Sequence, residues 1–230
     1  MYYSGVDLSY LVFVIPPLIF ALWAQFRVKS AFSKYSKVPS ERGMTGADAA
    51  RMVLHANGIG DVRIERVSGE LTDHYDPKAN VIRLSNSTYD AQTAAAVGVA
   101  AHEAGHAAQY ASRYLPIRIR ASIIPVTNIG SNLAFPIVLL GLLFSLQPLL
   151  YIGVAFFGLA VFFQLVTLPV ELNASRRALD CLANSGLSDE SVKAAKKVLT
   201  AAALTYVAAL ATAIGNFLRL LSLANRGRRR

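Results

Sequence analysis

Two histidines and a glutamate stand at metal-binding spacing in the stretch Ala101–His106. Its pattern is H-E-x-x-H, with His102 and His106 four residues apart in an Ala-rich segment that predicts a helix. Residues four apart lie on one face of a helix, so both imidazoles can bind one ion, and zinc accepts such nitrogen ligands. Glu103 lies to the side of that face, where its carboxylate can take a proton from a metal-bound water. The spacing therefore supplies two ligands and a base.

The same pattern also fits two histidines that only make ordinary hydrogen bonds on a helix face. Two of the four histidines in the chain fall here, and the small residues around them leave the site uncovered, so we favour the metal. Catalytic zinc takes three protein ligands and a water. Glu171 directly follows an apolar run, where an ionisable group is costly without a partner. Glu171 is thus the candidate third ligand, and the alternative is an interfacial glutamate paired with Arg176 or Arg177.

The composition is that of a membrane protein. Hydrophobic residues make up 54% of the 230 residues and charged residues only 16%, which is too apolar for an ordinary soluble domain. We expect the net charge of +9 in cytoplasmic loops, where it reports orientation, and no basic segment indicates nucleic-acid binding. The single Cys181 excludes an internal disulfide and a cysteine-based zinc site.

The sequence predicts a mainly α membrane protein with a small cytoplasmic α+β part. Apolar runs long enough to cross a bilayer separate its parts. These are an N-terminal transmembrane anchor (1–38), a cytoplasmic α+β part with the H-E-x-x-H helix at the membrane face (39–122), a transmembrane helical hairpin (123–170), and a third-ligand helix followed by an Ala-rich membrane-associated helix (171–230). Pro16 and Pro17 are expected to kink the anchor.

Basic residues set the expected orientation. Four of them follow the first apolar run within residues 27–37, so the positive-inside rule places the N-terminus outside and the next segment in the cytoplasm. A fourth span over Val198–Leu223 would put the basic tail, residues 226–230, outside against the same rule. The topology of residues 198–230 therefore stays open. We expect a multi-pass protein of the inner (plasma) membrane whose active site faces the cytoplasm.

The cytoplasmic part predicts one helix and three short strands before the H-E-x-x-H helix. Thr45–Asp48 resembles a capping box and opens a helix that ends before Gly58. Segments 61–67, 71–75 and 81–84 have strand patterns. The expected arrangement is a short antiparallel sheet.

Three stretches resemble those of the YugP-type neutral zinc metallopeptidases of bacterial membranes, and the resemblance covers nearly the whole chain. They are Leu71–Pro77, Ala101–His106 and Leu168–Ala178. The resemblance implies that His102, His106 and Glu171 bind one zinc ion and that Glu103 is the general base. In the similar gluzincin group, aspartate often stands four residues after the third ligand. Ser175 stands there in this chain, and its hydroxyl can hydrogen-bond a ligand histidine.

The expected function is zinc-assisted hydrolysis of peptide bonds in membrane or membrane-near proteins. The alternative is a membrane scaffold or regulator whose zinc site is structural or gated by a partner. Glu103 favours the enzyme, because a structural site has no use for an uncoordinated glutamate beside the ion. A transporter is less favoured, because no paired broken helices occur in matching halves. Cobalt or manganese could occupy the same ligands.

Further residues are candidates for substrate contact and for stabilising the oxyanion. His74, Arg176 and Arg177 are candidate donors to the oxyanion, together with Tyr75; a simple turn residue is the alternative for His74. Asn80, Val81 and Ile82 would pair with an extended substrate if their strand lay at the edge of the sheet. An internal strand is the alternative.

Overall fold

The computed structural model describes residues 8–227, and the last three arginines of the basic tail lie outside the described residues. The chain divides into two units. Unit 1 comprises Met1–Gln25, Ile119–Leu168 and Thr205–Arg230, and unit 2 comprises Phe26–Arg118 and Pro169–Leu204. In chain order the elements are α1 (Leu8–Phe13), α2 (Ile15–Tyr35), the 3₁₀ helix η1 (Glu41–Gly43), α3 (Gly46–Ala56), β1 (Arg63–Val67), β2 (His74–Asp76), β3 (Val81–Ser85), α4 (Asn86–Tyr89), α5 (Ala94–Ala111), α6 (Leu115–Leu143), α7 (Gln147–Asn184) and α8 (Asp189–Gly227).

The described chain is mainly helical, as the sequence predicts, with one small sheet. Its helices include four that are long and apolar enough to cross a membrane. These are Leu8–Tyr35, Leu115–Leu143, Gln147–Asn184 and Asp189–Asn225. The last of them covers the segment whose topology the sequence leaves open. By length and composition, that segment can span a bilayer.

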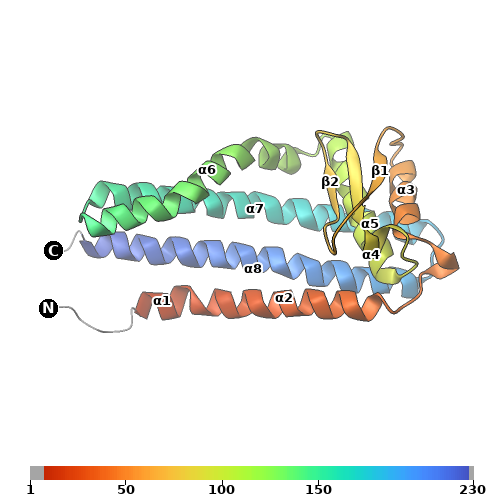
Figure 1. Cartoon of the computed structure of the whole chain (residues 1–230), viewed down its shortest axis with the longest axis horizontal. Helices are drawn as coiled ribbons and strands as arrows, with labels where there is room; N and C mark the ends of the chain where they lie inside the picture. The colour runs from red at the N-terminus through yellow and green to blue at the C-terminus, as the bar shows by residue number, and fades with distance from the viewer. Residues whose placement is uncertain (1–7, 228–230) are drawn as a thin grey trace. The chain divides into compact units, whose positions relative to one another are not determined.

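Unit 1 consists of the apolar parts of these helices, which run side by side (Figure 1). Small residues bring neighbours close: Gly153 of α7 packs on Val138 of α6. On the other side of α7, Gly158 faces the ring of Phe217 on α8. This use of glycine at helix contacts is typical of packing in membranes, where van der Waals contact replaces the hydrophobic effect.

The first apolar segment breaks at Val14, just before its two prolines, and this agrees with the expected kink. Pro17 has no N–H, so the carbonyl of Phe13 loses its usual donor four residues on. Gly215 of α8 packs directly on that carbonyl; a Cβ there would lie 2.0 Å from the Phe13 oxygen. The kink is therefore also the place where α1 and α2 contact α8.

The sheet of unit 2 is mixed, so the prediction of an antiparallel sheet is wrong for one of its two pairs. The strand order is β1-β3-β2, with β2 antiparallel to β3 and β1 parallel to it. After β1 the chain reverses and crosses to the far side before β2, and the turn 77–80 then returns it as β3. The most apolar strand thereby takes the centre, and Val81 and Ile82 are fully buried.

Helix α3 of unit 2 starts as the sequence predicts. Thr45 and Asp48 form a reciprocal capping box at the start of α3, and Gly58 has the left-handed φ of +67° that the end of a helix requires. Thr93 caps α5 by accepting a hydrogen bond from Ala96 N. The strands and α3 pack around α5 (Figure 1), and one apolar core joins them to the unit 2 parts of α7 and α8.

Two glycines seven residues apart let α5 approach its neighbours in unit 2. A Cβ on Gly98 would lie 3.3 Å from Ala195 of α8, and a Cβ on Gly105 only 2.5 Å from the backbone oxygen of Ala174 on α7. The second contact has no room for a side chain, because a carbonyl of a packed helix cannot rotate away. The approach of α5 to α7 therefore depends on Gly105.

Gly105→Ala should destabilise unit 2, because the added methyl group forces α5 and α7 apart. Overpacking of this kind typically costs about 1–3 kcal/mol. The measurement is thermal unfolding of the detergent-solubilised protein. Gly60→Ala is the control, since a Cβ at Gly60 meets no atom within 4 Å. Equal unfolding temperatures for the two variants would contradict the close packing.

Candidate metal centre

The described part of the chain contains one cluster of side chains that could hold a metal ion: His102 and His106 of α5 and Glu171 of α7. Glu171 Oε2 lies 3.3 Å from His102 Nε2 and 3.4 Å from His106 Nε2. The two rings are nearly perpendicular, with centroids 4.7 Å apart. All three side chains are largely buried. Two nitrogens and one carboxylate oxygen thus converge on a single point within unit 2.

The other nitrogen of each imidazole has its own partner. His102 Nδ1 lies 3.0 Å from Ser175 Oγ, which is the contact anticipated for this hydroxyl. His106 Nδ1 lies 3.0 Å from Gln109 Oε1. Occupied Nδ1 atoms leave the two Nε2 atoms directed at the centre of the cluster. This is the arrangement in which outer partners orient metal-binding histidines.

The hydrogen bonds around Gln109 determine which nitrogen of His106 carries the proton. Arg177 Nε can only donate, and it donates to Asn173 Oδ1 at 2.9 Å. Gln109 Nε2 donates to the same oxygen at 3.0 Å and to Val170 O at 2.7 Å. The amide oxygen of Gln109 must then face His106 and accept the proton of Nδ1. When the ring is neutral, the lone pair is therefore on His106 Nε2, the state that binds a metal.

Glu103 is buried beside the cluster, and its carboxylate makes a hydrogen bond with the sheet rather than with the two histidines. Its Oε2 accepts a hydrogen bond of 3.0 Å from the backbone N–H of Tyr75 in β2. Its other oxygen makes no hydrogen bond to any residue within 8–227. One oxygen is therefore held by the sheet, while the other can meet a small polar molecule such as water.

The acidic surroundings favour a positive charge at the site. Burial lowers the pKa of His106, but the hydrogen bond with Glu171 and the charges of Glu103 and Glu171 outweigh it and raise the pKa above its usual value. The same negative potential attracts a metal cation. A proton and a metal ion compete for one nitrogen, so acid opposes metal binding.

Two predictions for neighbouring residues are not supported by contacts within residues 8–227. The exposed His74 has its Nδ1 2.8 Å from Thr72 O and makes no hydrogen bond to the cluster. Arg176 is also exposed and lines a groove of about 450 Å³ between α7 and α8 in unit 2. An oxyanion role for either residue remains a prediction. Arg177, as described above, acts on Asn173.

The proposed pairing of an extended substrate with Asn80, Val81 and Ile82 is wrong. Val81 and Ile82 belong to β3, which has a strand on each side. Asn80 ends the preceding turn, and its amide oxygen accepts a hydrogen bond from Tyr75 Oη. No free backbone edge is left there for another strand. The alternative of an internal strand is the correct one.

Gln109, Asn173 and the backbone of Tyr75 were not anticipated as parts of the site. Gln109 could have been found, because it lies one helical turn after His106 and is polar in an otherwise small and apolar stretch. Asn173 is equally placed one turn before Arg177. No sequence pattern could identify the N–H of Tyr75, because every residue except proline has one.

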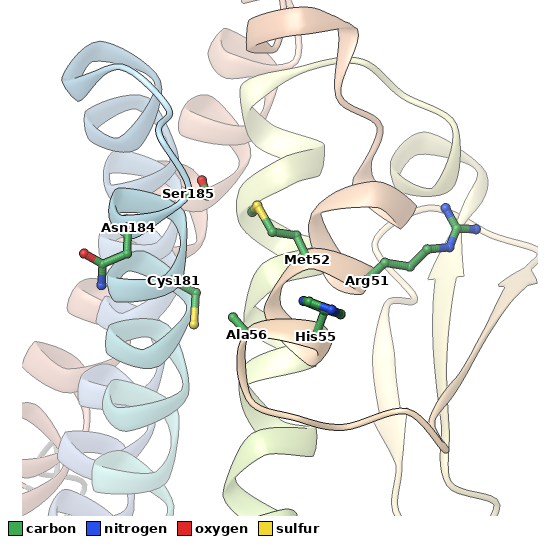
Figure 2. Close-up of a pocket in the computed structure, with 7 residues that line it drawn as sticks. All are labelled: Arg51, Met52, His55, Ala56, Cys181, Asn184 and Ser185. Carbon is green, nitrogen blue, oxygen red and sulfur yellow. The ribbon is translucent and has the colours of Figure 1, made fainter.

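A larger groove in unit 2 lies between the end of α3 and the end of α7 (Figure 2). Its volume is about 570 Å³, and Figure 2 shows His55 and Met52 on one wall and Cys181 on the other. Cys181 is half-buried, and its sulfur accepts a hydrogen bond from Asn57. None of the three residues of the metal-binding cluster lines this groove. This groove is thus distinct from the cluster.

The chemistry of the cluster fits zinc. Two imidazole nitrogens and one carboxylate oxygen are the ligand set of a catalytic zinc site that keeps a position for water. The described ligand atoms all lie within 4.8 Å of one another, so one ion can reach them with small side-chain adjustments. The hydrogen bond with Gln109 already holds His106 in the tautomer that such an ion needs.

Comparisons with known proteins agree with this chemistry. A family described as "Putative neutral zinc metallopeptidase" matches residues 10–225. The chain is 44% identical over 220 residues to the "Putative membrane protease YugP" of Bacillus subtilis (strain 168). The aligned region covers 95% of this chain and 98% of the relative. No solved structure matches the chain. Because the match spans nearly the entire sequence, the chain belongs to the neutral zinc metallopeptidase family that carries this description.

Proposed function

We propose that the protein is an integral-membrane zinc endopeptidase that cleaves membrane or membrane-near proteins at the cytoplasmic face. One observation carries the proposal: His102, His106 and Glu171 converge on a point beside the buried Glu103. Family membership supports the chemistry, and the apolar helices support the membrane. In this proposal α5 lies near the membrane face, and the substrate is a protein or peptide.

His102, His106 and Glu171 would hold one zinc ion. Bound zinc would supply a Lewis acid that lowers the pKa of a water molecule and polarises the scissile carbonyl. Gln109 Oε1 accepts the Nδ1 proton of His106, and Ser175 Oγ makes a hydrogen bond with His102 Nδ1, so both rings are held with Nε2 toward the centre of the cluster. These contacts cost nothing during the reaction, because folding has already made them.

Glu103 would act as the general base. The Tyr75 N–H holds one carboxylate oxygen and thereby sets the direction of the other. That oxygen takes the proton of the attacking water, and Glu103 then passes the proton to the nitrogen of the leaving amine. The alternative of a scaffold with a structural zinc site would leave Glu103 without a role. A buried carboxylate outside the ligand set is therefore the feature that favours an enzyme.

Glu103→Gln should retain zinc and lose cleavage. The amide keeps the shape of the side chain but cannot accept the proton, so the rate should fall about 10²–10⁴-fold. Glu171→Ala should lose both zinc and cleavage. The measurement is casein or peptide cleavage by the solubilised protein, with metal content determined on the same sample. Cleavage by Glu103→Gln at the rate of the unaltered protein would refute the assignment of the base.

Gln109→Leu should weaken zinc binding without removing a ligand. Loss of the acceptor for His106 Nδ1–H frees the ring to rotate and to change tautomer, and such outer partners typically contribute about 10–100-fold in metal affinity. Zinc affinity is measured by competition with a chelator. Gln92→Leu is the control, because Gln92 is exposed near η1 and its side chain belongs to no part of this network. Equal affinities in the two variants would remove Gln109 from the site.

Unit 2 should be cytoplasmic, because the basic residues in the last part of α2 and at the start of α8 lie within it. Four spans then place the α6–α7 connection outside, together with both termini. In a Cys181→Ser background, an impermeant maleimide added to intact cells should label Phe144→Cys in that connection but not Lys78→Cys in the exposed β2–β3 turn. In permeabilised cells, the maleimide should label both Phe144→Cys and Lys78→Cys. Labelling of Lys78→Cys in intact cells would reverse the topology.

A further inference from the structure

Three polar residues form a stripe on the outside of α6. Asn128, Ser131 and Asn132 lie at positions i, i+3 and i+4, and all three are exposed. They lie near the middle of the part of α6 that belongs to unit 1, residues 119–143. None of their side chains makes a hydrogen bond to the residues that the structure describes. If α6 spans the membrane, this stripe lies close to the bilayer midplane.

The helix that α6 packs against does not cover the stripe. Thr127, Gly130, Ala134 and Val138 are the buried residues of α6 in this region, and Gly130 faces Phe156 of α7. The three polar residues lie to one side of that contact face. Their exposed neighbours in sequence are apolar, as lipid contact requires: Ile129 is 61% exposed and Phe135 is 69% exposed. The asparagines are exceptions within a lipid-compatible surface.

Unpaired asparagines are unfavourable at this depth. Lipid chains offer no hydrogen bonds, so an exposed amide keeps the full cost of leaving water. Pro136 adds to the deficit, because it has no N–H to donate to the carbonyl of Asn132 four residues earlier. Polar side chains within transmembrane helices instead pair with those of a neighbouring helix. The stripe therefore requires a partner that residues 8–227 of the same chain do not provide.

We propose that this polar stripe is the contact between two copies of the chain in the membrane. An amide is both donor and acceptor, so the stripe is complementary to itself. A twofold axis along the membrane normal places identical residues at identical depth, opposite one another. The small Ser131 between the asparagines allows the two helices to approach closely. A second copy thus meets the hydrogen-bonding requirement with no further assumption, and the proposal depends only on α6 spanning the bilayer.

Cysteine cross-linking in native membranes tests the proposal. In a Cys181→Ser background, Ser131→Cys should form a disulfide-linked species of twice the chain's mass when the membranes are oxidised. Leu133→Cys is the matched control: it is 45% exposed at nearly the same depth, but it lies on the opposite side of α6. This variant should stay monomeric.

The paired asparagines give a second measurement. Asn128→Leu combined with Asn132→Leu should weaken dimerisation in detergent about tenfold or more, measured by sedimentation, because the interhelical hydrogen bonds are lost. Leu133→Ala should not change it. Cross-linking of Ser131→Cys no stronger than that of Leu133→Cys, or into a product of any other mass, would overturn the proposal. These results do not depend on peptidase activity, so a failure here is distinct from a failure of the proposed function.

Discussion

The contact between α5 and α7 is the constraint on which the rest of the site depends. Gly105 lies directly on the backbone of Ala174, and Gln109 joins the same two helices by hydrogen bonds to Val170 and Asn173. The first contact sets how close the helices come, and the second sets how they are rotated. Glu171 can reach the two histidines only when both conditions hold. The metal-binding geometry is therefore a property of a helix pair rather than of one motif.

Arg177 determines which groups donate and which accept in the hydrogen bonds around Gln109. The guanidinium of Arg177 can only donate, and this fixes the amides of Asn173 and Gln109 in turn. The last residue in this series of hydrogen bonds is His106, which carries its proton on Nδ1. His102 is held more simply, by the hydroxyl of Ser175. Neutral partners orient both rings, so no carboxylate other than Glu171 and Glu103 needs to be buried there.

The sheet supports the chemistry indirectly. Its central strand β3 is buried in the core of unit 2, and the short β2 at its edge presents the N–H of Tyr75 to Glu103. A small sheet thus holds a carboxylate that belongs to a helix. In α7, Glu171 follows Pro169 by two residues within one continuous helical segment.

Much of the fold and the core of the site can be predicted from local sequence. The capping box at Thr45, the apolar runs and the H-E-x-x-H spacing are read from local sequence, and the corresponding helices form where expected. Glu171 could also be predicted as the third metal ligand, because a carboxylate at the end of an apolar run needs a partner. Family resemblance added specificity to that choice.

Only the tertiary structure decided which distant groups meet. The parallel pairing of β1 with β3, which placed Val81 and Ile82 inside the sheet, depends on the path of the chain and not on strand propensity. The hydrogen bond from Tyr75 N–H to Glu103 uses a backbone group that nearly every residue possesses, so no residue type could predict it. Residue types and spacing thus determined which side chains can do chemistry. Packing of helices and strands far apart in the chain determined which of them do it together, because backbone groups and close approaches carry no sequence signature.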